Sequence, residues 1–542
     1  MKNFTHTKNF LKINRTINLI CFILLFSITA FCQKNKLQVL NTETIVGENL
    51  INGSAIIGTE FIFPAVIREV FFDSETNFAT VQLKGKKNSG IILQYDLKNK
   101  KILWNKTIDY DANELLKFDK LLILNEYNEA YVIDNYTGIN LSKVINYIYF
   151  ANPYHNIGIA YLYLSAGEGY YTNDLMGIDL LKGKLVWKRN INRAFGWNDY
   201  FYLNDSTLMV VAAGLHTINM NTGDGWDYDA ETGEKLKPNY TNEITGAVIG
   251  GLIGGIIGGL IGGGLYYIPT YYAATATGDD VIRDLNSNTL MNGDFIYFAS
   301  KEELVKINTE SGNIIWKSTF PKDLPSKSSL FMDDSVVYMV NHGFAIKNNR
   351  KINYGNAFIA AFNKFTGKQK FNILTPKKNG QILDYKQIDN ELYLLFQKVI
   401  AKYSLETGNL ISEKIFPIKE IGELKNFVDN NLYISNSDGY FFNLAQFLHI
   451  NTTQGIIISV DPEINILNIL KVKDTGINYL GYKEYQFIAK DEKTFVIDDQ
   501  GKIIIEFDVS PNAFIFDDIL YDKREKSIIT IDLKNNALQI TQ

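Results

Sequence analysis

The sequence predicts an all-β fold, a β-propeller of four-stranded blades, and three observations lead to this prediction. A short phrase recurs in which apolar residues alternate up to an Asp or Asn, a turn ends in Gly, and a second apolar run follows. Its copies recur at intervals of about 40 residues, the length of one four-stranded blade. The chain also holds 34 Phe and 32 Tyr against 5 Trp, a profile typical of strands, and it lacks long helical periodicity.

The clearest copy of the phrase runs from Ile178 to Trp187. Asp179 opens the turn by hydrogen bonding to the backbone ahead of it, and Gly183 takes the positive φ that such a turn requires. Apolar β-formers flank the turn, so the phrase predicts a β-hairpin. Trp187 is large enough to cover the seam between neighbouring sheets. The corresponding residues in other copies are Asp96, Trp104, Asp134, Gly138, Asn308, Gly312, Trp316, Gly367 and Gly408.

The spacing of the copies predicts the number of blades. The residue that opens the turn recurs at positions 96, 134, 179, 219, 308, 363, 404 and 498. The interval after Asn219 contains an insertion, and the interval before Asp498 hides a degenerate copy near 440–443 and 456–461. We expect eight blades, with seven as the alternative.

The phrase Asp-x-x-Thr-Gly-x-x-x-Trp resembles the repeat of the PQQ-like, quinoprotein-type β-propeller family. The resemblance extends from about Leu40 to the C-terminus, at the level of single repeats. Quinoprotein alcohol dehydrogenases share it with the propeller lipoprotein of the outer-membrane β-barrel assembly machinery, so it implies the fold and leaves the activity open. Quinoprotein dehydrogenases hold their cofactor against an adjacent pair of disulfide-linked cysteines. The chain has no Cys after Cys32, so we expect no bound cofactor.

Residues 1–32 are expected to form a secretory signal peptide. A basic start without acids precedes an apolar run from Ile17 to Phe31. A retained anchor helix is the alternative, and Cys32 is either removed with the signal or acylated. We expect the propeller, residues 33–542, in the periplasm or at the outer membrane of a Gram-negative bacterium, with secretion as a further possibility. The chain's net charge of −5 argues against nucleic acid as a partner.

Residues 244–276 form an insertion within the propeller and contain no charged residue. Gly250, Gly254, Gly258 and Gly262 recur every four residues, so on a helix they form one smooth stripe, a glycine zipper of the kind that membrane helices use. Each Gly costs a water-exposed helix about 1 kcal/mol relative to Ala. We therefore expect a membrane-seeking or self-packing segment, with packing against the propeller surface as the alternative.

Strands are expected along the rest of the chain, where apolar alternation is bounded by polar turns. The last of them, 528–532, is expected to close the ring by pairing with 37–40 or with the strand after Ile51, as the terminal strands of propellers often do. The clearest of the others are 60–72, 78–84, 121–124, 157–164 and 208–212.

Residues that could take part in catalysis or metal binding are scattered along the sequence. The chain contains no nucleophile elbow, no His-Glu-x-x-His and no phosphate loop, and its histidines lack metal-ligand spacing. Asp224, Asp227 and Asp229 suggest calcium, but Thr232 occupies the position where a calcium loop needs Gly, so an exposed pair of turns is the favoured interpretation. We assign no catalytic, cofactor or metal site. Candidates for the loop face, with packing between blades as the alternative, are Trp197, His216, Trp226 and His342.

The sequence therefore predicts a non-catalytic envelope propeller that acts as a scaffold for one or more envelope protein partners. Membrane contact through residues 244–276 is part of this hypothesis. An accessory role in outer-membrane protein assembly is a second hypothesis, and a degenerate PQQ-dependent dehydrogenase is a third.

Overall fold

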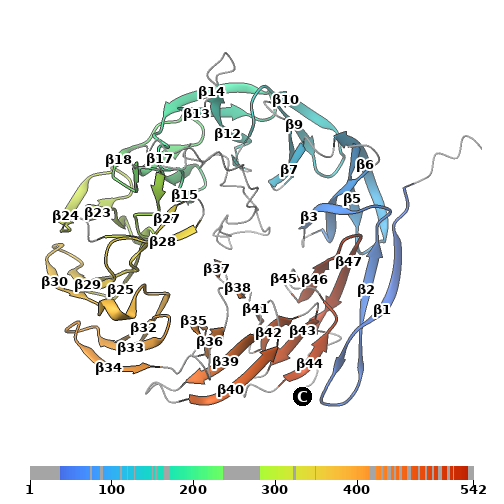
Figure 1. Cartoon of the computed structure of the whole chain (residues 1–542). Coiled ribbons are helices and arrows are strands. Elements are labelled where there is room, and N and C mark those ends of the chain that lie inside the picture. Colours follow the sequence, from blue (N-terminus) through green and yellow to red (C-terminus); the bar gives the residue numbers. More distant parts are fainter. Residues whose placement is uncertain are drawn as a thin grey trace, which may run out of the picture.

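A computed structural model describes residues 37–534, with one long gap at 236–280 and short gaps elsewhere. The expected signal peptide (1–32) and the glycine zipper (244–276) lie outside the described residues. The described strands form a ring of antiparallel sheets, most of them four-stranded (Figure 1). The chain is therefore a β-propeller, as its repeats predict, and its described residues contain no α-helix.

Eight four-stranded sheets follow one another around the described part of the ring, and we number them as blades 1 to 8. A continuous eleven-stranded sheet completes the described ring and contains two further sets of four strands, blades 9 and 10. Blades 1 to 3 are β3 (Ile67–Asp73), β4 (Phe78–Lys84), β5 (Ser89–Asp96), β6 (Lys101–Asp109); β7 (Asn113–Phe118), β8 (Leu121–Glu126), β9 (Glu129–Asp134), β10 (Asn140–Val144); and β11 (Phe150–Asn152), β12 (Ile157–Tyr163), β13 (Tyr171–Asp179), β14 (Lys184–Asn190).

Blades 4 to 7 contain most of the residues discussed below. Their strands are β15 (Asp199–Asn204), β16 (Thr207–Val211), β17 (Gly214–Asn219), β18 (Asp227–Asp229); β21 (Leu290–Asn292), β22 (Phe295–Ala299), β23 (Glu303–Asn308), β24 (Ile314–Thr319); β25 (Ser328–Met332), β26 (Val336–Asn341), β29 (Phe358–Asn363), β30 (Gln369–Leu374); and β31 (Asp384–Ile388), β32 (Glu391–Leu395), β33 (Val399–Ser404), β34 (Leu410–Ile415). A short 3₁₀ helix, Lys377–Asn379, precedes blade 7.

Blades 8 to 10 return the chain to its starting point. Their strands are β35 (Glu423–Val428), β36 (Asn431–Ser435), β39 (Gln454–Val460), β40 (Ile466–Lys473); β41 (Ile477–Tyr482), β42 (Tyr485–Lys490), β43 (Lys493–Ile497), β44 (Ile503–Phe507); and β45 (Phe514–Phe516), β46 (Ile519–Lys523), β47 (Ser527–Asp532), with β2 (Ala55–Ile62) as the outer strand.

The two ends of the described chain close the ring in blade 10. Strand β2 pairs antiparallel with β47, with Thr59 opposite Thr530. This pairing confirms the expectation that the terminal strand joins the strand after Ile51. The closure also includes β1 (Leu40–Asn49), which pairs with β2 and, through Gly47 to Asn49, with β44 of blade 9. The hairpin β1–β2 therefore connects the outer edges of two neighbouring blades.

The number of blades exceeds the eight or seven that the repeat spacing predicts. Blade 10 has no repeat phrase of its own between its third and fourth strands, because the fourth is supplied by the N-terminal β2. The degenerate copy is also divided: β39 belongs to blade 8, whereas β37 (Phe441–Leu444) forms a hairpin with β38 (Phe447–Ile450) that pairs with β41 of blade 9.

The expected strand 60–72 is interrupted in the structure. β2 ends at Ile62 and β3 begins at Ile67, in a different blade. Pro64 lies in the break, and a proline has no N–H to donate to a strand ladder. The expected strands 78–84, 121–124, 157–164 and 208–212 match β4, β8, β12 and β16 to within two residues.

One additional sheet lies outside the series of blades. It orders β19 (Gly233–Lys235), β20 (Val281–Arg283), β27 (Phe344–Lys347) and β28 (Arg350–Asn353). β27 and β28 form the connection between the second and third strands of blade 6, and Figure 1 shows them inside the ring. β19 and β20 belong to the connection from blade 4 to blade 5.

Two faces of the ring follow from this topology. One face, the repeat-turn face, carries the turns between the first and second and between the third and fourth strands of each blade. The other, the connection face, carries the links between blades and the loops between second and third strands. The additional sheet therefore lies on the connection face. Apolar residues between adjacent blades form the core; one cluster joins Leu116, Ile159 and Val210 of blades 2, 3 and 4.

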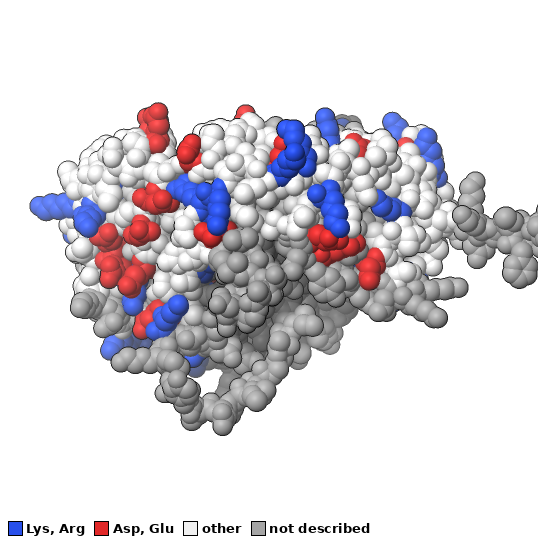
Figure 2. Space-filling model, turned by 90° about the horizontal axis from the view of Figure 1, so that it is seen from above, with Lys and Arg blue, Asp and Glu red and all other residues white. Residues whose placement is uncertain are grey.

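Charged side chains of both signs lie beside one another on the part of the rim seen in Figure 2. No extended basic patch is visible on the described part of that view. Among the described residues, none forms a helix that is long and apolar enough to cross a membrane.

Candidate functional site

The repeat residues join each blade to the next. The indole N–H of Trp187 in blade 3 donates to the carbonyl oxygen of Met220 in blade 4 at 2.7 Å. Its ring covers Gly223, where φ is +80° and where an added Cβ would lie 2.8 Å from the ring. Trp104 and Trp316 make the same joint: Trp104 donates to the carbonyl of Asn135 and covers Gly138, and Trp316 donates to the carbonyl of Lys364 and covers Gly367.

The acidic or amide residue of each phrase shapes the turn that receives the Trp. Asp134 Oδ1 accepts the backbone N–H groups of Tyr136 and Thr137, at 3.0 and 2.7 Å. Asp96, Asp179 and Asn308 accept backbone N–H groups in their own turns in the same way. The glycines of these turns have positive φ values: Gly138 71°, Gly183 65°, Gly312 72°, Gly367 70° and Gly408 74°.

Trp226 makes a fourth joint, which the repeat pattern did not reveal. Its indole N–H donates to the carbonyl of Thr309 at 2.8 Å, and its ring covers Gly312 of blade 5. Trp226 follows Asn219 by seven residues, whereas Trp187 follows Asp179 by eight. The copy in blade 4 is one residue shorter, so its Trp falls out of register with the phrase.

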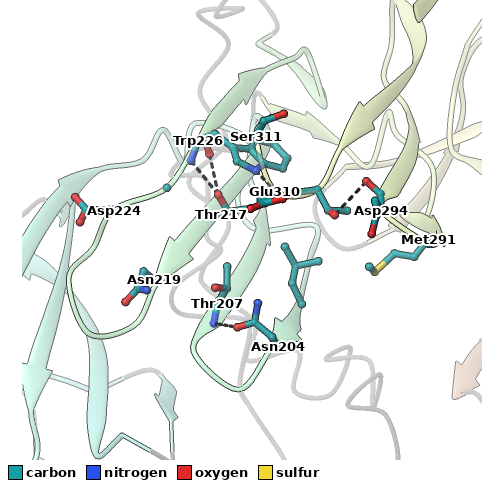
Figure 3. A pocket seen from close by; sticks show the side chains of 14 residues that line it. Asn204, Thr207, Thr217, Asn219, Asp224, Trp226, Met291, Asp294, Glu310 and Ser311 are labelled. Atoms are coloured by element: carbon teal, nitrogen blue, oxygen red, sulfur yellow. Dashed lines mark hydrogen bonds between the residues drawn. The ribbon is translucent and has the colours of Figure 1, made fainter. Parts of the chain in front are cut away.

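A pocket of about 580 Å³ opens beside Trp226, at the seam between blades 4 and 5 (Figure 3). Turns of both blades line it, all on the repeat-turn face. The lining residues are Leu203, Asn204, Thr207, Thr217, Asn219, Asp224, Gly225 and Trp226 from blade 4, and Met291, Gly293, Asp294, Thr309, Glu310 and Ser311 from blade 5. Its volume lies within the range of small-ligand pockets.

Hydrogen bonds within each blade hold the pocket wall in place. The Trp226 N–H donates to Thr217 Oγ1 at 2.9 Å, and the Thr207 N–H donates to Asn204 Oδ1 at 3.0 Å. On the blade 5 side, the Thr309 hydroxyl donates to the carbonyl of Asp294 at 3.1 Å. Figure 3 shows Asp224 on one side of Trp226 and Asp294 on the other. The lining holds carboxylates, amides and hydroxyls, and no Lys, Arg or His.

A charged cluster supports this wall from behind. Asp227 Oδ1 lies 2.6 Å from both Arg189 Nη2 of blade 3 and His216 Nδ1, while His216 Nε2 faces the carbonyl of Ala212 at 2.7 Å. Arg189 also donates to the carbonyls of Gly223 and Trp226. Burial opposes ionisation of Asp227, but the hydrogen bond from His216 and the charge of Arg189 outweigh it and lower the pKa of the Asp227 carboxyl.

The candidates for the loop face are located as follows. Trp226 lines the pocket, whereas Trp197, His216 and His342 are buried. Trp197 donates to the hydroxyl of Tyr161 at 2.7 Å. His342 Nε2 lies 2.9 Å from Ser329 Oγ, and its Nδ1 lies 3.0 Å from the carbonyl of Ile382. These three side chains therefore pack in or between blades.

Two acids of the sequence cluster Asp224, Asp227 and Asp229 have different surroundings in the structure. Asp227 is engaged by Arg189 and His216, and Asp224 lies on the pocket wall. Within the described residues, no group of three or more His, Cys, Asp or Glu side chains could hold a metal ion. The pocket as a whole is suited to hydrogen bonding with a polar or cationic group.

Comparisons with known proteins assign no family to the chain. No protein-family model matches it, and no curated protein matches it. The solved structure of BamB from Moraxella catarrhalis is 14% identical over 68% of this chain and 92% of that chain, with a TM-score of 0.30. NirN, a dihydro-heme d1 dehydrogenase, is 9% identical over 81% of this chain and 80% of that chain, with a TM-score of 0.29. Likenesses of this degree do not assign a function.

Proposed function

We propose that the protein is a non-catalytic β-propeller scaffold of the cell envelope that binds a protein partner and contacts a membrane through residues 244–276. The pairing of β19 with β20 carries this proposal. Lys235 and Val281 are direct cross-strand partners, so the chain leaves for residues 236–280 and returns at one point on the connection face. An uncharged apolar segment that begins and ends at one point can contact a membrane from one side, without separating the blades that flank it.

The arrangement of the two faces supports the scaffold role. The pocket between blades 4 and 5 lies on the repeat-turn face, whereas the two ends of the insertion lie on the connection face. A propeller held to a membrane by its connection face would therefore leave the pocket open to a partner. Turns fixed on a rigid set of strands are the usual place for recognition.

An accessory role in outer-membrane protein assembly is a narrower form of this proposal. In this narrower form the partner is the outer-membrane assembly machinery, whereas the scaffold proposal leaves the identity of the partner open. The degenerate quinoprotein dehydrogenase stays a prediction from the repeat phrase, and no contact in the pocket favours it.

Fractionation of cells tests the membrane part of the proposal. We expect the full chain in the membrane fraction and a chain lacking residues 244–276 in the soluble fraction. A second variant, Ile253→Asp with Ile257→Asp, keeps the length of the insertion and removes its uninterrupted apolar character, so it should behave like the deletion. A soluble full chain, or a deletion variant that stays in the membrane fraction, would contradict contact through this segment.

A further inference from the structure

The additional sheet on the connection face is strongly basic for its size. Its four strands, β19, β20, β27 and β28, hold five Lys or Arg residues and one Glu. The chain as a whole has a net charge of −5. We call these four strands the basic sheet. A local excess of positive charge on an acidic protein indicates a surface for an anionic partner.

The strand register places three of the cations on one face of the basic sheet. Arg283 is the partner of Ile346, which is itself the partner of Lys351. Cross-strand partners share a face, so Arg283 and Lys351 stand two strands apart, at about 10 Å. Lys235 lies opposite Val281, two residues from Arg283, so it joins the same face at a diagonal separation of about 7–8 Å.

Two acids near these cations, among the residues that the structure describes, have partners elsewhere. Glu234, the acid within the sheet, lies 3.1 Å from Lys301 Nζ and accepts the Tyr354 hydroxyl. Asp284, which follows β20, accepts the side-chain amide of Asn198 at 2.8 Å. Lys235 and Lys351 are exposed, and the Lys351 ammonium lies 4.5 Å from the centre of the Phe344 ring. Lys235 and Lys351 therefore place positive charge at the exposed surface of the sheet.

The position of these cations indicates the kind of anion. Lys235 is the last residue of β19, at the point where the chain departs for the uncharged residues 244–276. Cations beside an apolar segment are typical of contact with the surface of an anionic membrane, because lipid phosphates attract Lys and Arg while apolar groups enter the layer beneath them.

We propose that the basic sheet binds the headgroups of anionic phospholipids through Lys235, Arg283 and Lys351. This inference rests on the proposed membrane contact and adds to it a preference for lipid charge. It also gives the molecule an orientation, because the basic sheet faces the lipid and the repeat-turn face points away from it.

Vesicle sedimentation tests the proposal with the full mature chain. The probes are vesicles of phosphatidylcholine alone and vesicles in which about a third of the lipid is phosphatidylglycerol. We expect the charged vesicles to bind more tightly, and added salt to weaken this difference. Lys235→Gln with Lys351→Gln should reduce binding to the charged vesicles by roughly tenfold or more, and Lys235→Glu with Lys351→Glu should reduce it further.

A matched control separates this site from the total charge of the protein. Lys368 and Lys370 are exposed residues of blade 6, in and beside a repeat turn. Lys368→Gln with Lys370→Gln changes the net charge equally and should leave vesicle binding unchanged. An equal loss of binding in both double variants would overturn the assignment to the basic sheet.

The remaining outcomes distinguish the two proposals. If the wild type binds both kinds of vesicle equally and the Gln variant is unaffected, the basic sheet has no headgroup role, although membrane contact stands. If the wild type binds neither kind, the membrane part of the proposed function fails as well. Binding of free glycerol phosphate without binding of vesicles would overturn the choice of a lipid surface.

Discussion

Gly223 illustrates how a single residue limits the joint between two blades. It has a φ of +80°, and its missing side chain leaves room for the Trp187 ring. Gly293 also has a positive φ, +57°, but nothing lies within 4 Å of the position that a Cβ would take. Substitutions at these two glycines therefore distinguish the free-energy cost of the backbone conformation from that of the contact with the Trp187 ring.

We expect Gly223→Ala to lower the free energy of unfolding by about 3 kcal/mol, because both the left-handed backbone and the overlap with Trp187 oppose a side chain. Gly293→Ala should cost about 1 kcal/mol, from the backbone alone. Urea unfolding of both variants measures the difference. Equal losses would show that the Trp joint contributes nothing at this position.

His342 predicts an acid-sensitive stability. Burial lowers the pKa of its imidazole to about 4, against an ordinary value of 6.5. Below pH 6.5 the unfolded chain takes up a proton that the folded chain does not accept until about pH 4. Stability should therefore fall as the pH falls through this window, by roughly 3 kcal/mol in total, and level off below it.

The test replaces His342 with Asn, whose side-chain amide N–H can take the place of the imidazole N–H that faces Ile382. We expect His342→Asn to flatten the pH dependence of urea unfolding between about pH 6.5 and 4. His155→Asn, in blade 3, is the control. A pH profile that is unchanged in His342→Asn would assign the acid sensitivity to other groups.

Sequence reasoning located the repeat residues but not the pocket. The phrase marks Asp179, Gly183 and Trp187 because a turn and a large ring have fixed spacings. Asn204, Asp294 and Glu310 are ordinary turn residues, and nothing in their own sequence distinguishes them from turns elsewhere. They become a site because two blades bring their turns together, an arrangement that depends on the tertiary structure. The shortened spacing before Trp226 was the available signal, since it marks the irregular blade at this seam.

The hairpin β1–β2 is the element on which closure depends. Gly47 and Glu48 of β1 pair with both β2 and β44, and a Cβ at Gly47 would overlap the carbonyl oxygen of Glu506. Val46 and Ile56 of this hairpin pack with Ile505 and Phe507 of blade 9 and with Leu520 of blade 10. The hairpin therefore covers the seam between the last two blades.

We expect Gly47→Val to detach β1 from β44 and to expose this seam. Hydrogen exchange should show reduced protection in Gly47–Asn49 and in β44, with little change in blades 2 to 4. Thr42→Val, at an exposed position of the same strand, places a valine away from β44 and is the control. Unchanged protection of β44 in Gly47→Val would contradict a role for β1 in covering it.

The strands were predictable wherever apolar alternation and the turn residues at both ends indicated the same boundaries. β4 coincides with its expected range because apolar alternation is bounded by turns at both ends. The expected strand 60–72 failed because periodicity alone does not show that Pro64 separates two blades. Closure between β2 and β47 was predictable because a ring fold leaves the terminal strands few other partners.

At the scale of the whole molecule, the ring was predictable and its size was not. Repeats fix the class of fold because each blade needs neighbours on both sides to bury its faces. The count of blades depends on recognising every copy of the phrase, and blade 10 has none because the N-terminal β2 supplies its fourth strand. The two faces of the ring also differ, since the connection face carries the basic sheet and the repeat-turn face carries the pocket.

Closure through β2 and β47 has a consequence for the order of events during synthesis. Strand β2 emerges early and has its inner neighbour only when β47, more than 460 residues later, has been made. The intermediate blades can form as the chain lengthens, but the ring is sealed only by this distant contact. Until then, the inner edge of β2 stays available to other chains. Completion of the last blade is thus the moment at which the growing protein passes from an open, association-prone arc to a closed molecule.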